Sequence, residues 1–178
     1  IRPLVLGSLG KAKIISSETC ALDIIGAKFV REIKCGEIIA IDKDGIKSYH
    51  PFPNTNERPC IFEYIYFARP DSIMGGKSVY EYRKKMGMEL AKECNTTGDI
   101  VIPVPDSGVP AALGYSEKAK IPFDLGIIRN HYVGRTFIEP TQKIRSFGVK
   151  LKLSSTRSII ENKKIILIDD SLVRGTTC

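Results

Sequence analysis

The chain has 178 residues, of which 43% are hydrophobic and 26% are charged, and its formal net charge is +7. This composition supports a folded core, and the length allows one domain or parts of two. No apolar run approaches the roughly 20 residues of a membrane-spanning helix, so we expect no membrane partner. The sequence opens at Ile1 without an initiator Met or a signal-peptide pattern. We therefore expect it to begin within a longer polypeptide.

The cysteines indicate the redox environment. There are five of them, and no Cys-x-x-Cys pair occurs. The odd number and the spacing argue against a disulfide framework and favour the reducing cytoplasm.

Basic residues are concentrated between residues 129 and 164. This segment holds nine Lys or Arg residues against two carboxylates, Glu139 and Glu161. Such a segment indicates an anionic partner, and a small polyphosphate suits it. Nucleic acid is an alternative that no accompanying motif supports. A solvated basic surface is the third interpretation.

The first 60 residues are predicted to form short strands and then a linker. Strands are predicted at residues 13–16, 29–33, 37–42 and 45–49. The sequence Lys43-Asp44-Gly45 is typical of a hairpin turn between the last two. Residues 51–59 contain three prolines and no periodicity, which indicates a linker or a domain boundary.

Strands and helices are predicted to alternate in the rest of the chain. An aromatic, β-branched run predicts a strand over residues 61–67. Ser78-x-x-Glu81 has the form of a capping box and predicts a helix over 79–92, although Gly87 disfavours that helix by roughly 1 kcal/mol. The later elements are strands at 99–104, 123–128 and 163–168, helices at 110–118 and 154–160, and a loop at 129–149. This alternation indicates a mostly parallel sheet covered by helices.

Two adjacent carboxylates, Asp169 and Asp170, follow the last predicted strand. In open α/β sheets, ligands bind just outside the carboxyl ends of the strands. Paired carboxylates there can hold Mg²⁺ or accept hydrogen bonds from sugar hydroxyls. The following Arg174-Gly175-Thr176-Thr177 offers backbone amides and hydroxyls to an anion. An ordinary surface turn is the alternative interpretation.

Two further loops have the composition of ligand-binding segments. Pro105-Asp106-Ser107-Gly108 follows a predicted strand, and its small residues allow the backbone to approach a pyrophosphate. A plain type I turn is the alternative there. The long basic loop over residues 129–149 suits a lid that closes over a polyphosphate and excludes water.

The segment from Ile166 to Thr177 is similar to the phosphoribosyl diphosphate (PRPP) signature of type I phosphoribosyltransferases. Its form Asp-Asp-Ser-x-Val-Arg-Gly-Thr-Thr resembles the amidophosphoribosyltransferase family. Other segments that resemble this family are residues 17–23, 62–72, 104–108 and 132–138. The resemblance covers nearly the whole chain, and the segments occur in the family's order.

This resemblance implies a fold of two parts and an activity. Residues 1–57 would be the C-terminal part of an N-terminal-nucleophile glutaminase domain, of α+β class. Residues 58–178 would be the first part of a type I phosphoribosyltransferase domain, with an α/β parallel sheet. The implied enzyme forms 5-phosphoribosylamine from PRPP and glutamine-derived ammonia in the first step of purine biosynthesis. It would be a cytoplasmic homo-oligomer with no nucleic-acid partner.

The resemblance also implies roles for individual residues. Tyr132 and Arg135 would belong to the catalytic loop, in which His131 stands where the family more often has Arg or Lys. Ser107 would lie near Mg²⁺ together with Asp169 and Asp170. The residues implied in PRPP binding are Asp169, Asp170, Ser171, Arg174, Gly175, Thr176 and Thr177.

Cys60 is implied as one ligand of a [4Fe–4S] cluster, as in the iron–sulfur subgroup of the family. Such a cluster normally needs four thiolates, and the family's other three would lie beyond Cys178. A lone cysteine is otherwise a small buried hydrophobic residue. The family's glutaminase nucleophile would precede Ile1.

Two other functions remain open from the sequence. One is a different PRPP-dependent transferase, with a nucleobase as the acceptor. The other is a non-catalytic regulator that senses PRPP or a nucleotide, because a fold can be reused for binding alone.

Overall fold

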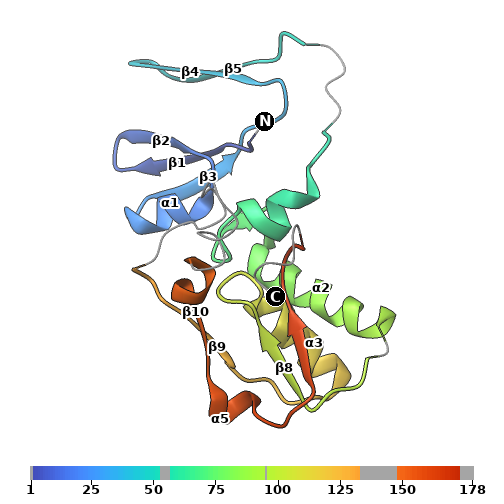
Figure 1. Ribbon diagram of the computed structural model, residues 1–178. Coiled ribbons are helices and arrows are strands. Elements are labelled where there is room, and N and C mark those ends of the chain that lie inside the picture. The colour runs from blue at the N-terminus through green and yellow to red at the C-terminus, as the bar shows by residue number, and fades with distance from the viewer. Residues whose placement is uncertain (1, 53–56, 95, 133–147, 173–178) are drawn as a thin grey trace. The chain divides into compact units, whose positions relative to one another are not determined.

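The computed structural model describes residues 2–52, 57–94, 96–132 and 148–172. The chain divides into two compact units, Ile1–Tyr80 and Glu81–Cys178, which we describe separately (Figure 1). The predicted domain boundary between residues 57 and 58 stays a prediction. None of the helices within the described residues combines the length and the apolar character that crossing a bilayer requires.

A three-stranded antiparallel sheet forms the centre of the first unit. Its strands are β1 (Val5–Leu9), β2 (Ala12–Ser16) and β3 (Lys28–Glu32), in the order β2-β1-β3. Helix α1 (Thr19–Ile24) buries Leu22 in a small core with Val5 and Ala27. The strands predicted at residues 13–16 and 29–33 are confirmed as β2 and β3. The sequence analysis missed β1 and the short helix α1.

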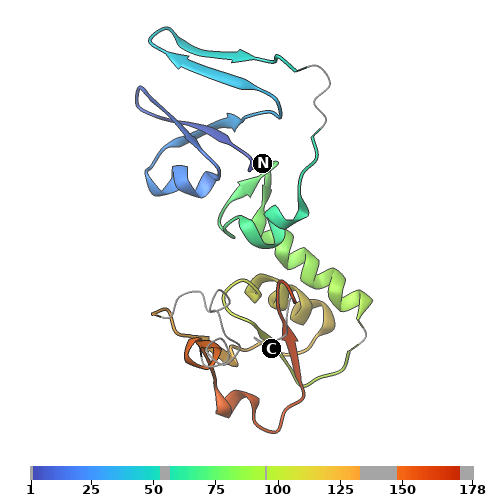
Figure 2. The ribbon, with the colours of Figure 1, turned by 45° about the horizontal axis from the view of Figure 1, so that its top comes forward.

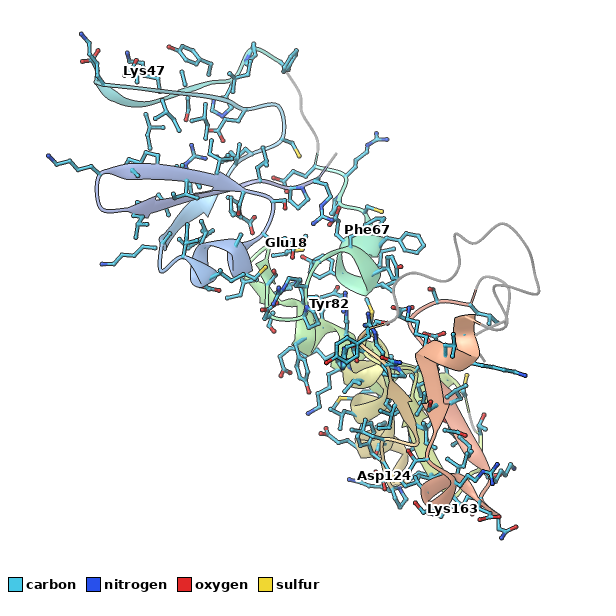
Figure 3. All side chains as sticks on the ribbon, turned by 60° about the vertical axis from the view of Figure 1, so that its left-hand side comes forward. Glu18, Lys47, Phe67, Tyr82, Asp124 and Lys163 are labelled. Carbon is cyan, nitrogen blue, oxygen red and sulfur yellow. The ribbon has the colours of Figure 1, made fainter. Side chains whose placement is uncertain are left out.

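The predicted hairpin is confirmed as β4 (Ile38–Asp42) and β5 (Gly45–Tyr49). Asp42 Oδ1 accepts a hydrogen bond of 2.8 Å from the Asp44 amide. Gly45 has a φ of 125°, which side chains disfavour. Lys47, labelled in Figure 3, pairs with Asp42 at 2.9 Å. The turn therefore depends on local contacts that the sequence already indicated.

The strand predicted over residues 61–67 is wrong, because this segment is helical. Residues 61–62 form a helical turn and Glu63–Phe67 forms a π-helix, η1. The Ala68 amide closes it with a 2.9 Å hydrogen bond to the Glu63 carbonyl. A β preference is realised only on a neighbouring strand, and no strand of the described chain pairs with this segment. The Tyr66 and Phe67 rings instead contact each other edge to face.

The segment after η1 is held by two side chains at the start of α1. These are Glu18, which precedes the helix, and Thr19, its first residue. Its two short strands are β6 (Ile73–Met74) and β7 (Lys77–Ser78). Glu18 Oε2 accepts hydrogen bonds from the Arg69 amide at 2.8 Å and from Ser72 Oγ at 2.9 Å (Glu18 is labelled in Figure 3). Thr19 Oγ1 accepts one from the Ile73 amide at 2.8 Å. These contacts make residues 69–73 part of the first unit.

A two-stranded parallel pair forms the centre of the second unit (Figures 1 and 2). The elements after residue 78 are α2 (Val79–Glu93), β8 (Ile100–Pro103), α3 (Val109–Ala119), β9 (Ile127–Arg129), β10 (Leu153–Ser155), α5 (Arg157–Ile160) and β11 (Ile165–Ile168). β8 pairs in parallel with β11. Phe123 forms a parallel bridge to Val101 on the other edge of β8. β9 pairs antiparallel with β10.

Most of the elements predicted here are confirmed, and three differ in extent. The helices predicted over 79–92 and 110–118 are α2 and α3, and the strands predicted over 99–104 and 163–168 are β8 and β11. The strand predicted over 123–128 is regular only in β9. The helix predicted over 154–160 starts at Arg157, because residues 153–155 pair with β9. Of the predicted loop over 129–149, residues 133–147 lie outside the described part of the chain, residue 129 ends β9, and residue 148 is helical.

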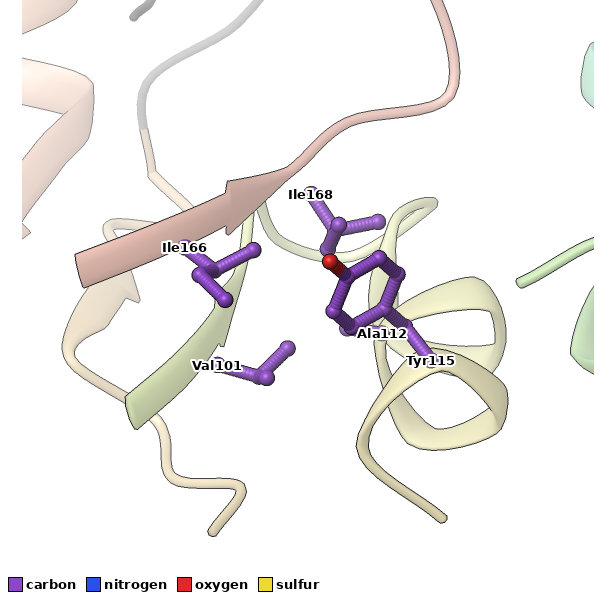
Figure 4. Packing of buried hydrophobic residues seen from close by; sticks show 5 residues of the cluster. All are labelled: Val101, Ala112, Tyr115, Ile166 and Ile168. Atoms are coloured by element: carbon purple, nitrogen blue, oxygen red, sulfur yellow. The ribbon is translucent and has the colours of Figure 1, made fainter. Parts of the chain in front are cut away.

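The core of the second unit lies between the parallel strands and α3. It consists of Val101, Ala112, Tyr115, Ile166 and Ile168. Figure 4 shows Tyr115 and Ala112 of α3 facing the isoleucines and the valine of the two strands. All four residues of β8 are buried, as expected for a central parallel strand covered by a helix.

Candidate functional site

The candidate site lies at the carboxyl edge of the β8–β11 pair. Because the two strands are parallel, the residues that follow them emerge at the same edge. The Val104 amide donates a 2.8 Å hydrogen bond to the Ile168 carbonyl, so the pairing continues to the last residue of β11. The chain passes from β8 to Phe123 on one edge and later reaches β11 on the other. Such a reversal of strand order is where open α/β sheets bind ligands.

Gly108 brings the loop after β8 against the end of β11. A Cβ atom at this position would lie 2.7 Å from the Ile168 carbonyl oxygen and 2.8 Å from that of Val104. Only a glycine permits this approach without displacement of the backbone. The loop that carries Ser107 is therefore held beside the residues that follow Ile168, and its Pro105–Asp106 peptide is cis.

The two carboxylates after β11 are half-buried and connected to each other. Asp169 Oδ1 accepts a 2.9 Å hydrogen bond from the Asp170 amide, and Asp170 Oδ1 accepts one of 2.9 Å from Ser171 Oγ. The second oxygen of Asp170, Oδ2, is buried without a hydrogen-bond partner. A buried acceptor without a partner is costly. A cation or a sugar hydroxyl at this edge would satisfy it.

A basic side chain crosses to this edge from the neighbouring part of the unit. Arg129, the last residue of β9, donates a 2.6 Å hydrogen bond from Nη1 to Asp106 Oδ2 in the loop after β8. Arg129 Nε is buried and has no hydrogen-bond partner. Two buried groups near this edge therefore lack a partner. Asp170 Oδ2 is an acceptor without a donor, and Arg129 Nε is a donor without an acceptor.

The structure places only some of the predicted site residues. Ser107 follows β8, and Asp169 and Asp170 follow β11, so the parallel pairing of these strands brings the three residues to the same edge of the sheet. Tyr132 is fully exposed in a turn, where its amide donates to Asn130 Oδ1 at 3.0 Å. The predicted site residues outside the described part of the chain are Arg135, Arg174, Gly175, Thr176 and Thr177.

The pairing of Asp106 with Arg129 was missed by the sequence analysis. Both residues stand in segments that it singled out, the loop after β8 and the start of the basic segment. No local pattern indicates that these two side chains meet, because their contact depends on which strands are neighbours. One hint of this contact was present in the sequence, namely a basic residue, Arg129, directly after a predicted strand.

The donor set at the strand edge fits Mg²⁺, whereas Cys60 supplies only one of the four thiolates that a [4Fe–4S] cluster needs. Mg²⁺ commonly takes one or two carboxylates and completes its shell with water and substrate phosphates, so Asp169 and Asp170 suffice. Cys60 is exposed, and its thiol is free. Over the described ranges, no three His, Cys, Asp or Glu side chains gather as metal ligands. The four thiolates of a [4Fe–4S] cluster are thus not assembled there.

Curated proteins of three organisms are similar to this chain over nearly its whole length. The amidophosphoribosyltransferase of Rhizobium etli is 61% identical over 99% of the chain. The chloroplastic amidophosphoribosyltransferase 1 of Arabidopsis thaliana is 55% identical, and the Mycobacterium bovis amidophosphoribosyltransferase is 50% identical, each over 99% of the chain. The chain spans 37%, 31% and 33% of the lengths of these three relatives. No family model matches the chain.

Solved structures with the same fold carry a related name. The glutamine PRPP amidotransferase from B. subtilis, complexed with ADP and GMP, superposes with a TM-score of 0.89 at 48% identity. The match covers 99% of this chain and 39% of that one. A second structure, described as the allosteric regulatory enzyme of purine biosynthesis, has the same TM-score and identity and is covered to 38%.

Proposed function

We propose that this chain is part of an amidophosphoribosyltransferase and that the strand edge at Asp169 and Asp170 binds PRPP. The observation that carries the proposal is the close approach of Gly108 to Ile168, which brings the Ser107 loop to the strand edge from which these two carboxylates emerge. Similarity to amidophosphoribosyltransferases over 99% of the chain supports it. The reaction would convert PRPP, glutamine and water into 5-phosphoribosylamine, glutamate and pyrophosphate.

In the proposed reaction, ammonia attacks the anomeric carbon of the ribose as the bond from that carbon to the pyrophosphate oxygen breaks. Asp169 and Asp170 accept hydrogen bonds from the ribose hydroxyls and fix the orientation of the ring. Arg129 places a guanidinium where charge develops on the departing pyrophosphate, which lowers the barrier electrostatically. A Mg²⁺ ion held by Asp169 and Asp170, with Ser107 nearby, would neutralise further phosphate charge.

The remaining roles are proposed from the resemblance. Tyr132 and Arg135 belong to a loop that closes over the bound substrate. Ser171 and the stretch from Arg174 to Thr177 hold the 5′-phosphate end of PRPP. Residues 1–57 are the end of a glutaminase domain that supplies ammonia. Cys60 is a ligand of a [4Fe–4S] cluster whose other thiolates come from outside the described residues. The intact enzyme is a cytoplasmic homo-oligomer.

The test is turnover by the full-length protein. We expect 5-phosphoribosylamine to form from PRPP with either glutamine or ammonia, and this formation to require Mg²⁺. Activity with a nucleobase as the only acceptor would identify a different PRPP-dependent transferase. Binding of PRPP without turnover under any of these conditions would identify a regulator. Either result would overturn the proposal.

A further inference from the structure

We propose that Asp106 is an internal counter-anion for Arg129, which it holds in the ligand-free site and releases to the pyrophosphate group of the substrate. This inference rests on the proposed function and adds a residue that sets substrate affinity. Asp106 would thus be a positioning residue: it acts on the substrate through Arg129 and weakens polyphosphate binding by competing for it.

The geometry of the pair makes Arg129 available at the strand edge. Its side chain starts at the carboxyl end of β9 and reaches the loop after β8, with Nη1 2.6 Å from Asp106 Oδ2. A guanidinium carries five N–H donors in a planar fork that matches phosphate as well as carboxylate. Nε is buried and unpaired, so the bond to Asp106 leaves part of the fork unsatisfied.

The burial of the two partners favours exchange over a permanent bond. The Asp106 side chain is 60% exposed and that of Arg129 is 34% exposed. Ion pairs with this exposure contribute only about 0–1 kcal/mol, because water screens them. A polyphosphate carries several negative charges and can accept two parallel bonds from Arg129. It would therefore displace the single carboxylate of Asp106.

The unpaired groups at this edge complement a magnesium-bound polyphosphate. Asp170 Oδ2 is a buried acceptor that lacks a donor or a cation, and Arg129 Nε is a buried donor that lacks an acceptor. A magnesium polyphosphate supplies both the cation and the anion. Asp106 supplies only an anion, and only to Nη1, so it is an incomplete substitute for that ligand.

A double-mutant cycle with inorganic pyrophosphate as the probe tests the inference. In the full-length protein with Mg²⁺ present, we expect Asp106→Asn to lower the Kd for pyrophosphate roughly twofold to fivefold, the equivalent of an exposed pair. Arg129→Gln should raise it about 10-fold to 100-fold, as for a lost charge-assisted hydrogen bond. In the Arg129→Gln background, Asp106→Asn should have no effect, because its action requires the guanidinium.

The measurements in the Arg129→Gln background distinguish two mechanisms. In one, Asp106 competes with the ligand for Arg129, and in the other its charge simply repels the ligand. If Asp106→Asn tightened pyrophosphate equally with and without Arg129, the carboxylate would act by repulsion alone and the inference would be overturned. No change in Kd on Asp106→Asn would also overturn it, while leaving the proposed function intact. Failure of the wild-type protein to bind pyrophosphate would overturn both.

A matched ion pair elsewhere in the unit serves as the control. Glu117 pairs with Lys84 at 2.7 Å, and its side chain is 50% exposed, comparable to Asp106. Glu117 lies in the last turns of α3, whereas the loop with Asp106 precedes the start of that helix. We expect Glu117→Gln to leave the Kd for pyrophosphate unchanged. Circular dichroism of each variant confirms that the fold is retained.

Discussion

Gly114 of α3 lies directly against the backbone of Lys84 in α2. A Cβ atom at Gly114 would stand 1.8 Å from the Lys84 carbonyl oxygen, and one at Gly87 would stand 1.8 Å from that of Ala111. The two helices therefore touch through reciprocal glycines, each seated on the other helix. Gly87 lowers the intrinsic helix propensity of α2, but it permits this contact.

Gly114→Ala should destabilise the protein, although alanine is the better helix former. Propensity alone would favour the alanine by roughly 1 kcal/mol. The new methyl group would meet backbone that cannot rotate away, and overpacking of this kind costs about 1–3 kcal/mol. Urea unfolding measures the balance, with Lys85→Ala at an exposed position of α2 as the control. A wild-type or higher midpoint for Gly114→Ala would contradict the close contact.

Glu18→Gln should loosen the segment over residues 69–73 and reduce the pH dependence of stability. Burial alone would raise the pKa of Glu18, but hydrogen bonds from the Arg69 amide, Ser72 and Arg2 and the Arg2 charge outweigh it, and the pKa lies below 4.5. Its stabilising effect is therefore complete above pH 4.5 and is lost as the pH falls below that value. We expect a loss of about 1–3 kcal/mol at neutral pH.

The same comparison at low pH checks the assignment of Glu18. The free energies of unfolding of wild type and Glu18→Gln should converge as the pH falls below 4.5 and the carboxylate becomes protonated. Glu89→Gln is the control, since Glu89 is 62% exposed and pairs with Lys92 on the helix surface. A constant gap across the pH range would contradict the role given to the Glu18 charge.

Arg31→Lys should weaken the attachment of β4 and β5 to β3. Arg31 donates to both oxygens of Glu37, at 2.9 and 2.6 Å, and to Ser48 Oγ at 3.0 Å. The hydrogen bond from Arg31 is the main reason that the pKa of Glu37 lies well below its ordinary value. A lysine keeps the charge but not the fork, so we expect a loss of about 1 kcal/mol.

Hydrogen exchange gives the direct readout for Arg31→Lys. The amides of β4 and β5 should exchange faster in the variant, whereas those of β8 and β11 should not change. Lys47→Arg is the control, because Lys47 pairs with Asp42 and both residues belong to the β4–β5 hairpin. Equal acceleration in the second unit would show that the effect is general and not a loss of this contact.

Asp170→Asn should reduce the use of PRPP by about one to three orders of magnitude, as is common when electrostatic stabilisation is removed. The substitution removes the charge of the side chain. An amide nitrogen at the buried Oδ2 position could no longer accept a hydrogen bond from a ribose hydroxyl or hold Mg²⁺. Steady-state kinetics of the full-length enzyme with varied PRPP measure the change. Asp124→Asn is the control, since Asp124 is exposed and precedes β9. An unchanged kcat/KM for PRPP would contradict the assignment of Asp170 to the PRPP site.

Gly108→Ala should impair ligand binding more than it impairs folding. Its methyl group would lie against the Ile168 and Val104 carbonyls and push the Ser107 loop away from the end of β11. We expect pyrophosphate binding to weaken about 10-fold and stability to fall by about 1–3 kcal/mol. Ala119→Gly, at the other end of α3, should cost about 1 kcal/mol and leave binding unchanged. Equal binding by both variants would contradict the role of Gly108.

Several elements could be read from neighbouring residues alone. The hairpin over residues 38–49 follows from Asp44-Gly45 between two β-branched runs. The start of α2 follows from Ser78 and Glu81. The strand–carboxylate tip at Asp169 follows from an apolar run that ends in two acids. In each case the pattern that predicts the element lies within a few residues along the chain.

Other features depend on partners that are distant in sequence. The aromatic run over residues 61–67 became a π-helix because no strand of the described chain pairs with it. Gly87 was counted against α2 because the helix that packs on it, α3, cannot be seen in a local pattern. Arg129 was one basic residue among nine until the fold placed its side chain beside the loop after β8.

The order of residues along the chain is enough to show which chemical groups are available: two carboxylates at a strand tip, a small-residue loop after another strand, and a basic segment. Local hydrogen bonding and side-chain periodicity are encoded in adjacent residues. Which of these groups meet depends on the folded unit. The approach of Asp106 to Arg129, or of Gly108 to Ile168, is decided by the order of strands in the sheet. That order is set by the packing of the whole unit, because every strand must bury its apolar face in the same core.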